Sequence, residues 1–316
     1  MRYPMKSLFL QGLILLSFIS TTSHAQQPRF LNLLPATGLA IVPLMEGWIA
    51  NPDGSKSFSF GYLNRNKEAV DIPHGDANFI DPLGYDGMQP THFPAGRHTG
   101  VFSVTIPEDK AETEVWWNIQ SGDSEILRVP GRIGRAGYEL DFILPRPQGS
   151  MQPLAGFGES TDISPGLLSS VRDYPNSVAV GAGVLLTVRV KDTSEREPND
   201  LQFSEALPLG VTFNKFQGEG AVTFTRHPEN IDLTKAEEKP KEPSVLCQGC
   251  TLSAGKKGPN TVSVSGGQGL ARVYASFSEP GDYIIHAKVD NFSAPDSSNT
   301  NQCCWTNVYQ RVTVSP

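Results

Sequence analysis

Four cysteines are the residues of this 316-residue chain with the widest choice of chemistry. Cys247 and Cys250 form a Cys-x-x-Cys pair, whereas Cys303 and Cys304 are adjacent in the segment Asn-Gln-Cys-Cys-Trp-Thr-Asn. In an exported protein, four cysteines predict two disulfides, with three possible connectivities. Adjacent strand residues point to opposite faces, so Cys303 and Cys304 are expected to bond Cys247 and Cys250 rather than each other. Each bridge would close a loop of about 55 residues, and the first would contribute roughly 4 kcal/mol.

The same cysteines allow three other interpretations. A Cys247–Cys250 bridge with a vicinal Cys303–Cys304 bridge also places all four cysteines in disulfides. Thiolates can instead bind zinc or copper, although an oxidising compartment competes for them and structural zinc ligands are usually spaced more widely. The Cys-x-x-Cys spacing occurs in redox proteins, but no βαβ pattern surrounds it. We therefore expect a staple that ties an inserted loop to the last strand.

A second group of candidate residues lies in the first half of the sequence, where carboxylates, amides and imidazoles alternate. Calcium takes about six to eight oxygen ligands, and histidines bind transition metals. The usual calcium-loop pattern is absent, so the alternative is a long polar loop whose Asp and Asn side chains cap turns. No cofactor is expected under that alternative. The candidate metal or ligand residues are Asp71, His74, Asp76, Asn78, Asp86, His92 and His98.

Two tryptophan positions are candidates for a ligand surface. Trp116 and Trp117 are adjacent, so on a strand one ring faces the core and the other faces solvent or a neighbouring segment. Trp305 follows the adjacent cysteines and is expected either in the core, at the start of the last strand, or as a platform for a sugar. Trp116 and Trp305 are therefore the candidate ligand-binding aromatics.

The N-terminus predicts export. Arg2 and Lys6 precede an apolar stretch over 8–19, and Ser23-His24-Ala25 fits the small-x-small signal-peptidase pattern. No later apolar run is long enough to span a bilayer. The chain has 26 Lys and Arg against 33 Asp and Glu, and loss of Arg2 and Lys6 makes it more acidic. An acidic chain without a basic cluster is a poor partner for nucleic acid, so we expect a periplasmic or secreted protein without a membrane span.

The fold predicted for the mature chain is all-β. Glycine (30) and proline (25) punctuate the sequence densely, and apolar residues alternate with polar ones. In 184–191, for example, Val184, Leu186, Val188 and Val190 share one face. Strands of this kind form antiparallel sheets packed face to face. The expected organisation is a signal peptide (1–25), an N-terminal β-sandwich (26–145), a Pro/Gly-rich linker (146–177) and a C-terminal β-sandwich (178–316) with an inserted loop (226–260).

In the second half, Gly218 and Gly220 precede Phe224 within 211–224, and Phe277-Ser-Glu-Pro-Gly-Asp-Tyr283 follows. These segments resemble PKD-like and immunoglobulin-like domains. The resemblance implies an immunoglobulin-like sandwich. Segments of the first half, Asn51-Pro-Asp-Gly, Phe60-Gly-Tyr-Leu-Asn-Arg-Asn and Gln89-Pro-Thr-His-Phe, look like a group of uncharacterised secreted bacterial proteins that also end in Cys-Cys-Trp-Thr-Asn. That resemblance implies location and architecture but no activity.

The function expected from these patterns is binding without catalysis. The sequence has no Gly-x-Ser-x-Gly elbow, His-Glu-x-x-His pair, Walker loop or dinucleotide fingerprint. We expect an exported binding protein whose ligand is a protein or a glycan. The alternatives are a periplasmic or extracellular metal-binding protein, for calcium, copper or zinc, and an accessory subunit of a secreted enzyme or envelope complex.

Overall fold

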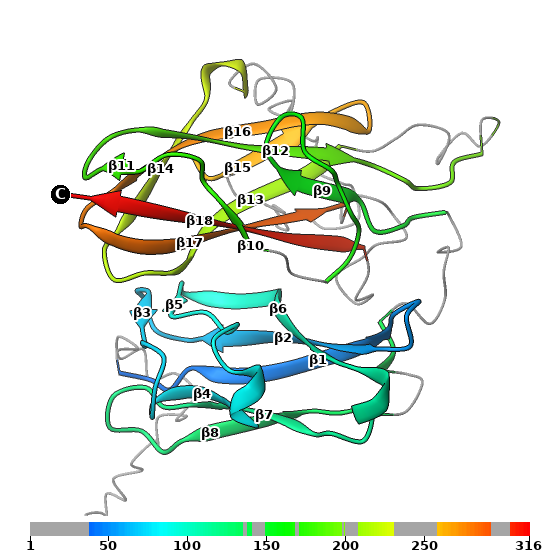
Figure 1. The fold of residues 1–316 in the computed structure, drawn as a ribbon, viewed down its shortest axis with the longest axis vertical. Coiled ribbons are helices and arrows are strands. Elements are labelled where there is room, and N and C mark those ends of the chain that lie inside the picture. Colours follow the sequence, from blue (N-terminus) through cyan, green and yellow to red (C-terminus); the bar gives the residue numbers. More distant parts are fainter. Residues whose placement is uncertain are drawn as a thin grey trace, which may run out of the picture. The chain divides into compact units, whose positions relative to one another are not determined.

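The described part of the chain, in a computed structural model, is built almost wholly from β-strands (Figure 1). The structure describes residues 38–134, 138–140, 149–167, 171–197, 199, 208–230, 258–291 and 304–316. The predicted signal peptide and most of the predicted loop 226–260 lie outside these ranges. The all-β class with antiparallel sheets is confirmed. No helix in the described ranges has the length and apolar character needed to cross a membrane.

The first half forms two antiparallel three-stranded sheets. One has the order β1-β2-β6, with β1 (Val42–Ala50), β2 (Lys56–Asn64) and β6 (Gly96–Ile106). The other has the order β4-β7-β8, with β4 (Asn78–Asp81), β7 (Val115–Ile119) and β8 (Leu127–Gly131). A short pair of β3 (Val70–Asp71) and β5 (His92–Phe93), and the 3-10 turns η2 (Leu83–Tyr85) and η3 (Glu108–Lys110), complete this half.

An aromatic core holds these two sheets together. Phe60 of β2 stacks on Phe102 of β6, with ring centroids 5.1 Å apart. Trp117 of β7 meets Phe102 edge to face at 5.0 Å. All three rings are almost fully buried, and edge-to-face and offset pairs add to the energy gained from buried area. The aromatic residues of β2 belong to this core, while the small residues Ser57 and Ser59, which alternate with them, are buried as well.

The second half is an immunoglobulin-like sandwich of two larger sheets. One sheet has the order β14-β16-β12-β9 and the other β10-β18-β17-β13-β15, with β11 also paired to β18. Their apolar faces form one core, which includes Leu186, Phe213, Val273 and Ile285. The strands are β9 (Leu154–Phe157), β10 (Val171–Asp173), β11 (Val178–Ala179), β12 (Val184–Lys191), β13 (Leu209–Gln217), β14 (Val222–Arg226), β15 (Thr261–Val264), β16 (Gln268–Phe277), β17 (Gly281–Asp290) and β18 (Trp305–Ser315), with the 3-10 turn η5 (Pro228–Asn230).

The segment 146–177, for which the sequence predicts a linker, contributes strands to this sandwich. β9 pairs with β12 in antiparallel register, from Phe157 opposite Val188 to Leu154 opposite Lys191. β10 pairs with β18 in parallel. The glycines and prolines that indicated a linker lie around short edge strands, where such residues are tolerated. The division of the chain into two domains stays a prediction, since residues 36–316 form one compact unit.

The two halves share apolar and polar contacts. Phe216 of β13 and Tyr309 of β18 belong to the same buried cluster as the aromatic residues of the first half. The Tyr309 hydroxyl donates to the Val101 carbonyl oxygen at 3.0 Å, and the Thr91 amide donates to the Phe216 carbonyl oxygen at 2.9 Å. The polar face of β17 is also partly covered by the first half, because Ile284 packs on its cluster and Lys288 bonds Thr99.

Candidate functional site

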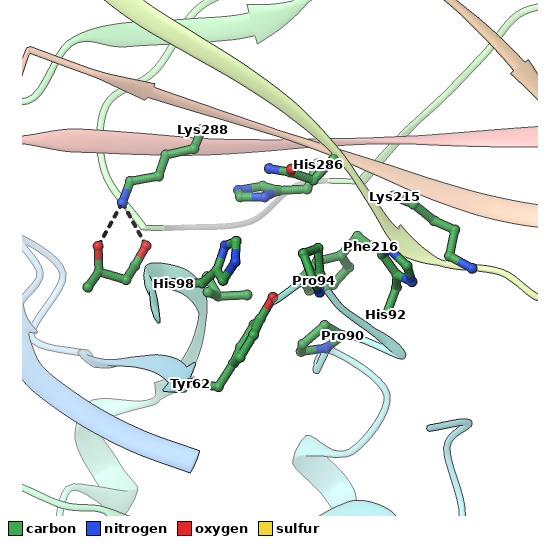
Figure 2. Close-up of a pocket in the computed structure, with 12 residues that line it drawn as sticks. Tyr62, Pro90, His92, Pro94, His98, Lys215, Phe216, His286 and Lys288 are labelled. Atoms are coloured by element: carbon green, nitrogen blue, oxygen red, sulfur yellow. Dashed lines mark hydrogen bonds between the residues drawn. The ribbon is translucent and has the colours of Figure 1, made fainter. Parts of the chain in front are cut away.

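A small cavity lies where β2, β5 and β6 meet β13 and β17 (Figure 2). Its volume is about 50 Å³, which is room for one or two water-sized groups. Tyr62, Val101 and Phe216 provide much of the apolar wall, while none of the lining residues is a carboxylate. The basic residues among them are His92, His98, Lys215, His286 and Lys288.

The two innermost histidines are fixed by hydrogen bonds to neutral acceptors. His286 Nε2 lies 2.9 Å from Asn307 Oδ1, and the Asn307 side-chain nitrogen donates to the Gly100 carbonyl oxygen. His98 Nε2 lies 3.1 Å from the Ala95 carbonyl oxygen, and its ring stacks on Tyr62. Burial lowers the pKa of His286 to about 4 and lowers the pKa of His98. Both rings are therefore neutral at pH 7.

A partly buried lysine lines the cavity, and a partly buried carboxyl group lies beside it. The Lys288 ammonium donates to the Thr99 carbonyl oxygen at 2.6 Å and lies 5.1 Å from the centre of the Trp305 ring. Burial lowers the pKa of Lys288, although Asp290 and Glu46 oppose that shift. Burial raises the pKa of Glu46, against the hydrogen bond from the Gly100 amide. The segment around Gly100 thus connects groups from β1, β6, β17 and β18.

Replacing Gly100 by alanine should lower the free energy of unfolding by about 1–3 kcal/mol. The backbone at Gly100 has φ +57°, and a Cβ atom there would overlap the Trp305 indole. Gly181 also has a positive φ (+74°), but nothing lies within 4 Å of the corresponding position. Urea unfolding of Gly100→Ala and Gly181→Ala separates the cost of a positive φ from the cost of overlap with Trp305. An equal loss in both variants would show that overlap with Trp305 contributes nothing.

The candidate residues of the polar stretch are not gathered around one point. Asp71 Oδ1 accepts from His92 Nδ1 at 2.7 Å and pairs with the Lys215 ammonium at 3.0 Å. Burial acts to raise the pKa of Asp71, but these bonds hold that pKa below its ordinary value. His74 bonds the Gln89 carbonyl oxygen, and Asp76 is exposed. Within the described ranges, no three His, Cys, Asp or Glu side chains could hold one metal ion.

Asn78 and Asp86 have partners in the backbone of their own region. The Asn78 amide donates to the carbonyl oxygens of Ile72 and Pro90 and accepts from the Trp117 indole. Asp86 accepts from the Ile80 amide at 2.8 Å. These are the bonds that a turn-capping role requires. The side chains hold the β4 region in place, and their oxygens are directed at protein donors.

The candidate residues near the C-terminus are buried where the structure describes them. Trp305 is only 3% exposed and packs with Leu140 and Leu167, so its ring is not available as a ligand surface. Cys304 is fully buried, and no described cysteine is a free thiol. Cys247, Cys250 and Cys303 lie outside the described residues, so the pairing of the cysteines stays a prediction.

Trp116 lies on the outer face of the β4-β7-β8 sheet. Val115 and Trp117 point into the core, so alternation places Trp116 on the opposite face. The Arg128 guanidinium lies over the Trp116 ring, 4.1 Å from its centre. Of the two tryptophans proposed as ligand surfaces, Trp116 is the one that remains partly exposed.

Exposed aliphatic residues follow the two strands that neighbour β7, at the end of the sheet where Trp116 lies. Trp116 is opposite Asp81 of β4 on one side and Pro130 of β8 on the other. Leu83, just beyond β4, is 72% exposed, and Ile133, just beyond β8, is 39% exposed. We name the five residues Leu83, Trp116, Arg128, Pro130 and Ile133 the tryptophan patch.

Comparisons with known proteins give no family. No protein-family description matches the chain, and no curated protein matches it. Among solved structures, the D00-D0 domain of intimin is 10% identical, with a TM-score of 0.24, over 88% of this chain and 100% of that one. The Yersinia pseudotuberculosis adhesin InvE is 8% identical, with a TM-score of 0.23, over 86% of this chain and 58% of that one. Likenesses this weak indicate no ligand or activity.

Sequence patterns alone missed Glu46, Tyr62, Lys215, His286 and Lys288 around the cavity. His286 and Lys288 occupy the polar phase of β17, opposite the core residues Ile285 and Ala287. A polar phase predicts a solvent-facing side. Its burial depends on coverage by the first half, for which the local sequence carries no signal.

Proposed function

We propose that this chain is an exported, non-catalytic binding protein that holds a protein partner on the tryptophan patch. The observations that carry the proposal are the partly exposed Trp116 beneath Arg128 and the exposed Leu83 and Ile133 in the segments just beyond β4 and β8, at the same end of one sheet. Contiguous exposed apolar side chains on a folded surface mark interaction sites more often than isolated ones do.

The composition of the patch favours a protein partner over a glycan. Tryptophan and arginine are the side chains most enriched at the energetic centres of protein interfaces. Arg128 covers part of the Trp116 ring, which leaves less indole surface for a sugar to stack on. Leucine and isoleucine at the rim suit apolar side chains of a partner and offer no hydrogen bond to sugar hydroxyls.

Substitution of Trp116 by alanine should weaken binding of the partner about 30-fold, the effect of losing about 2 kcal/mol at an interface centre. A photo-crosslinking amino acid at position 83 would first capture the partner in the exporting host. The captured protein, once identified and purified, is then titrated against the wild-type chain, Trp116→Ala and Val180→Ser. Val180 is 37% exposed and lies away from the patch, after β11, so its substitution should leave the affinity unchanged.

Three results would overturn this proposal. The first is equal affinity of the identified partner for wild type and Trp116→Ala. The second is binding of a glycan panel that is lost in Trp116→Ala, which would replace the protein partner with a sugar. The third is turnover of glycosides or esters by the purified chain, abolished by replacing one carboxylate.

A further inference from the structure

Three polar atoms at the cavity are without a partner among the described residues. They are the Tyr62 hydroxyl oxygen and the Nδ1 atoms of His98 and His286. Tyr62 is only 2% exposed, and Figure 2 shows its hydroxyl end directed toward the two histidine rings. Their residues line the cavity, so these three atoms are available to whatever fills it.

The hydrogen bonds of the two histidines define which nitrogen carries the proton. The Ala95 carbonyl oxygen can only accept, so His98 Nε2 is the donor. The Asn307 amide nitrogen is already bonded to the Gly100 carbonyl, so its Oδ1 faces His286 Nε2 and makes that nitrogen the donor. In each neutral ring Nδ1 therefore has a lone pair. A second proton on either ring must bind at Nδ1.

No carboxylate lines the cavity, so no negative charge among its lining residues opposes an anion there. Lys288 and Lys215 line it, and their ammonium groups bond the Thr99 carbonyl oxygen and Asp71; Asp71 also bonds His92, and Glu46 bonds the Gly100 amide. In Figure 2 the Lys215 side chain extends away from His98 and His286. The charged or titratable groups near the two rings are Glu46 of β1, Tyr62 of β2, Asp71 of β3, His92 of β5, Arg97 of β6, Lys215 of β13, and Lys288 and Asp290 of β17.

We propose that this cavity binds one small anion, of the size of chloride, nitrate or formate, together with one proton taken from solvent by His98 or His286. The anion accepts a hydrogen bond from the Tyr62 hydroxyl and one from the newly protonated Nδ1. No covalent bond forms, and the added positive and negative charges cancel. The volume of about 50 Å³ suits an anion of this size.

Proton uptake is a necessary part of this binding. Two neutral rings would present lone pairs to the anion, which repel it, whereas one protonated ring presents a charge-assisted donor. Because burial lowers the pKa of both histidines, the proton is absent near neutral pH until the anion arrives. Above pH 6.5 the apparent affinity should therefore fall about tenfold for each pH unit, the signature of one proton bound per anion.

The test is a titration of the mature protein, with ¹⁵N-labelled histidine, by sodium nitrate at pH 6.5 and pH 7.5. Sodium gluconate, whose anion is too large for the cavity, keeps the ionic strength constant. We expect saturable changes in the ring-nitrogen resonances of His98 and His286, with an apparent Kd about tenfold larger at pH 7.5. Tyr62→Phe keeps the ring and removes one donor, so it should weaken binding about tenfold or more. His74→Asn, outside the cavity, is the matched control.

Each of three results would overturn the inference. The first is equal shifts with nitrate and with gluconate, which would then report ionic strength alone. The second is an equal Kd at pH 6.5 and at pH 7.5, which removes the coupled proton. The third is binding by Tyr62→Phe, with a thermal midpoint close to wild type, that is as tight as binding by His74→Asn. Should Tyr62→Phe fail to fold, His98→Gln replaces it, with the same loss of binding expected.

Discussion

Replacing Trp117 by alanine should lower the free energy of unfolding by about 3–5 kcal/mol. The ring is completely buried and meets Phe60 and Phe102 edge to face, at 6.1 and 5.0 Å. Its indole nitrogen donates to Asn78 Oδ1 at 3.0 Å. The truncation therefore opens a cavity between two sheets and leaves a buried amide oxygen without its donor. Urea unfolding followed by far-ultraviolet circular dichroism measures the loss.

Trp116 provides the matched control because it is the adjacent residue on the same strand. It lies on the outer face, partly exposed beneath Arg128, so Trp116→Ala should cost less than about 1 kcal/mol. A third variant, Trp117→Phe, keeps an aromatic ring but leaves Asn78 unpaired, with an expected cost of about 1–3 kcal/mol. Equal destabilisation by Trp116→Ala and Trp117→Ala would contradict the assignment of the two faces.

The sequence predicted strands well where one face is apolar along the whole strand. In β12, Val184, Leu186, Val188 and Val190 alternate and all four are buried in the core. The all-β class follows from such patterns, because period-two alternation has one structural meaning. The tryptophan pair was harder, since adjacency predicts opposite faces without saying which ring is inside. That choice depends on the register of β7 with β4 and β8.

The cavity could not be predicted from local patterns. Tyr62, His98 and His286 come from three strands that are distant in the sequence. The residues next to each of them in the sequence show no pattern that distinguishes these strands from the others. The linker was predicted from glycine and proline content, but edge strands such as β9 have the same composition. In both cases the missing information is tertiary: it concerns which surfaces meet when the chain folds, while composition and periodicity describe single elements.

The stability of the protein should fall by about 3 kcal/mol between pH 7 and pH 4 through His286 alone. Burial lowers the pKa of His286 to about 4 from an ordinary value of 6.5. Between these values the unfolded chain binds a proton that the folded chain does not. The contribution of neutral His286 to the free energy of unfolding is therefore complete above pH 6.5. It is lost as the pH falls toward 4. Urea unfolding at half-unit steps of pH measures this slope.

His286→Gln isolates this contribution from the other titrating groups. Glutamine can still donate to Asn307 Oδ1 but does not titrate, so the difference between wild type and variant should shrink by about 3 kcal/mol as the pH falls from 7 to 4. Glu46, whose pKa burial raises, and Asp71, whose pKa is lowered, titrate in both proteins and cancel in the comparison. His74→Asn, at an exposed site outside the cavity, is the control.

The choice of salt decides whether the full pH dependence of the unfolding free energy is measured. A small anion bound with a proton would stabilise the folded state at low pH and offset the loss that protonation causes. Sodium gluconate should therefore give the full loss, and sodium nitrate a smaller one, in wild type and His74→Asn. In gluconate, the unfolding free energy of His286→Gln should lack the pH dependence that His286 contributes. If wild type and His286→Gln show the same dependence of unfolding free energy on pH in gluconate, the His286 imidazole is solvated in the folded protein. The buried junction between β17 and β6 would then have to be rejected.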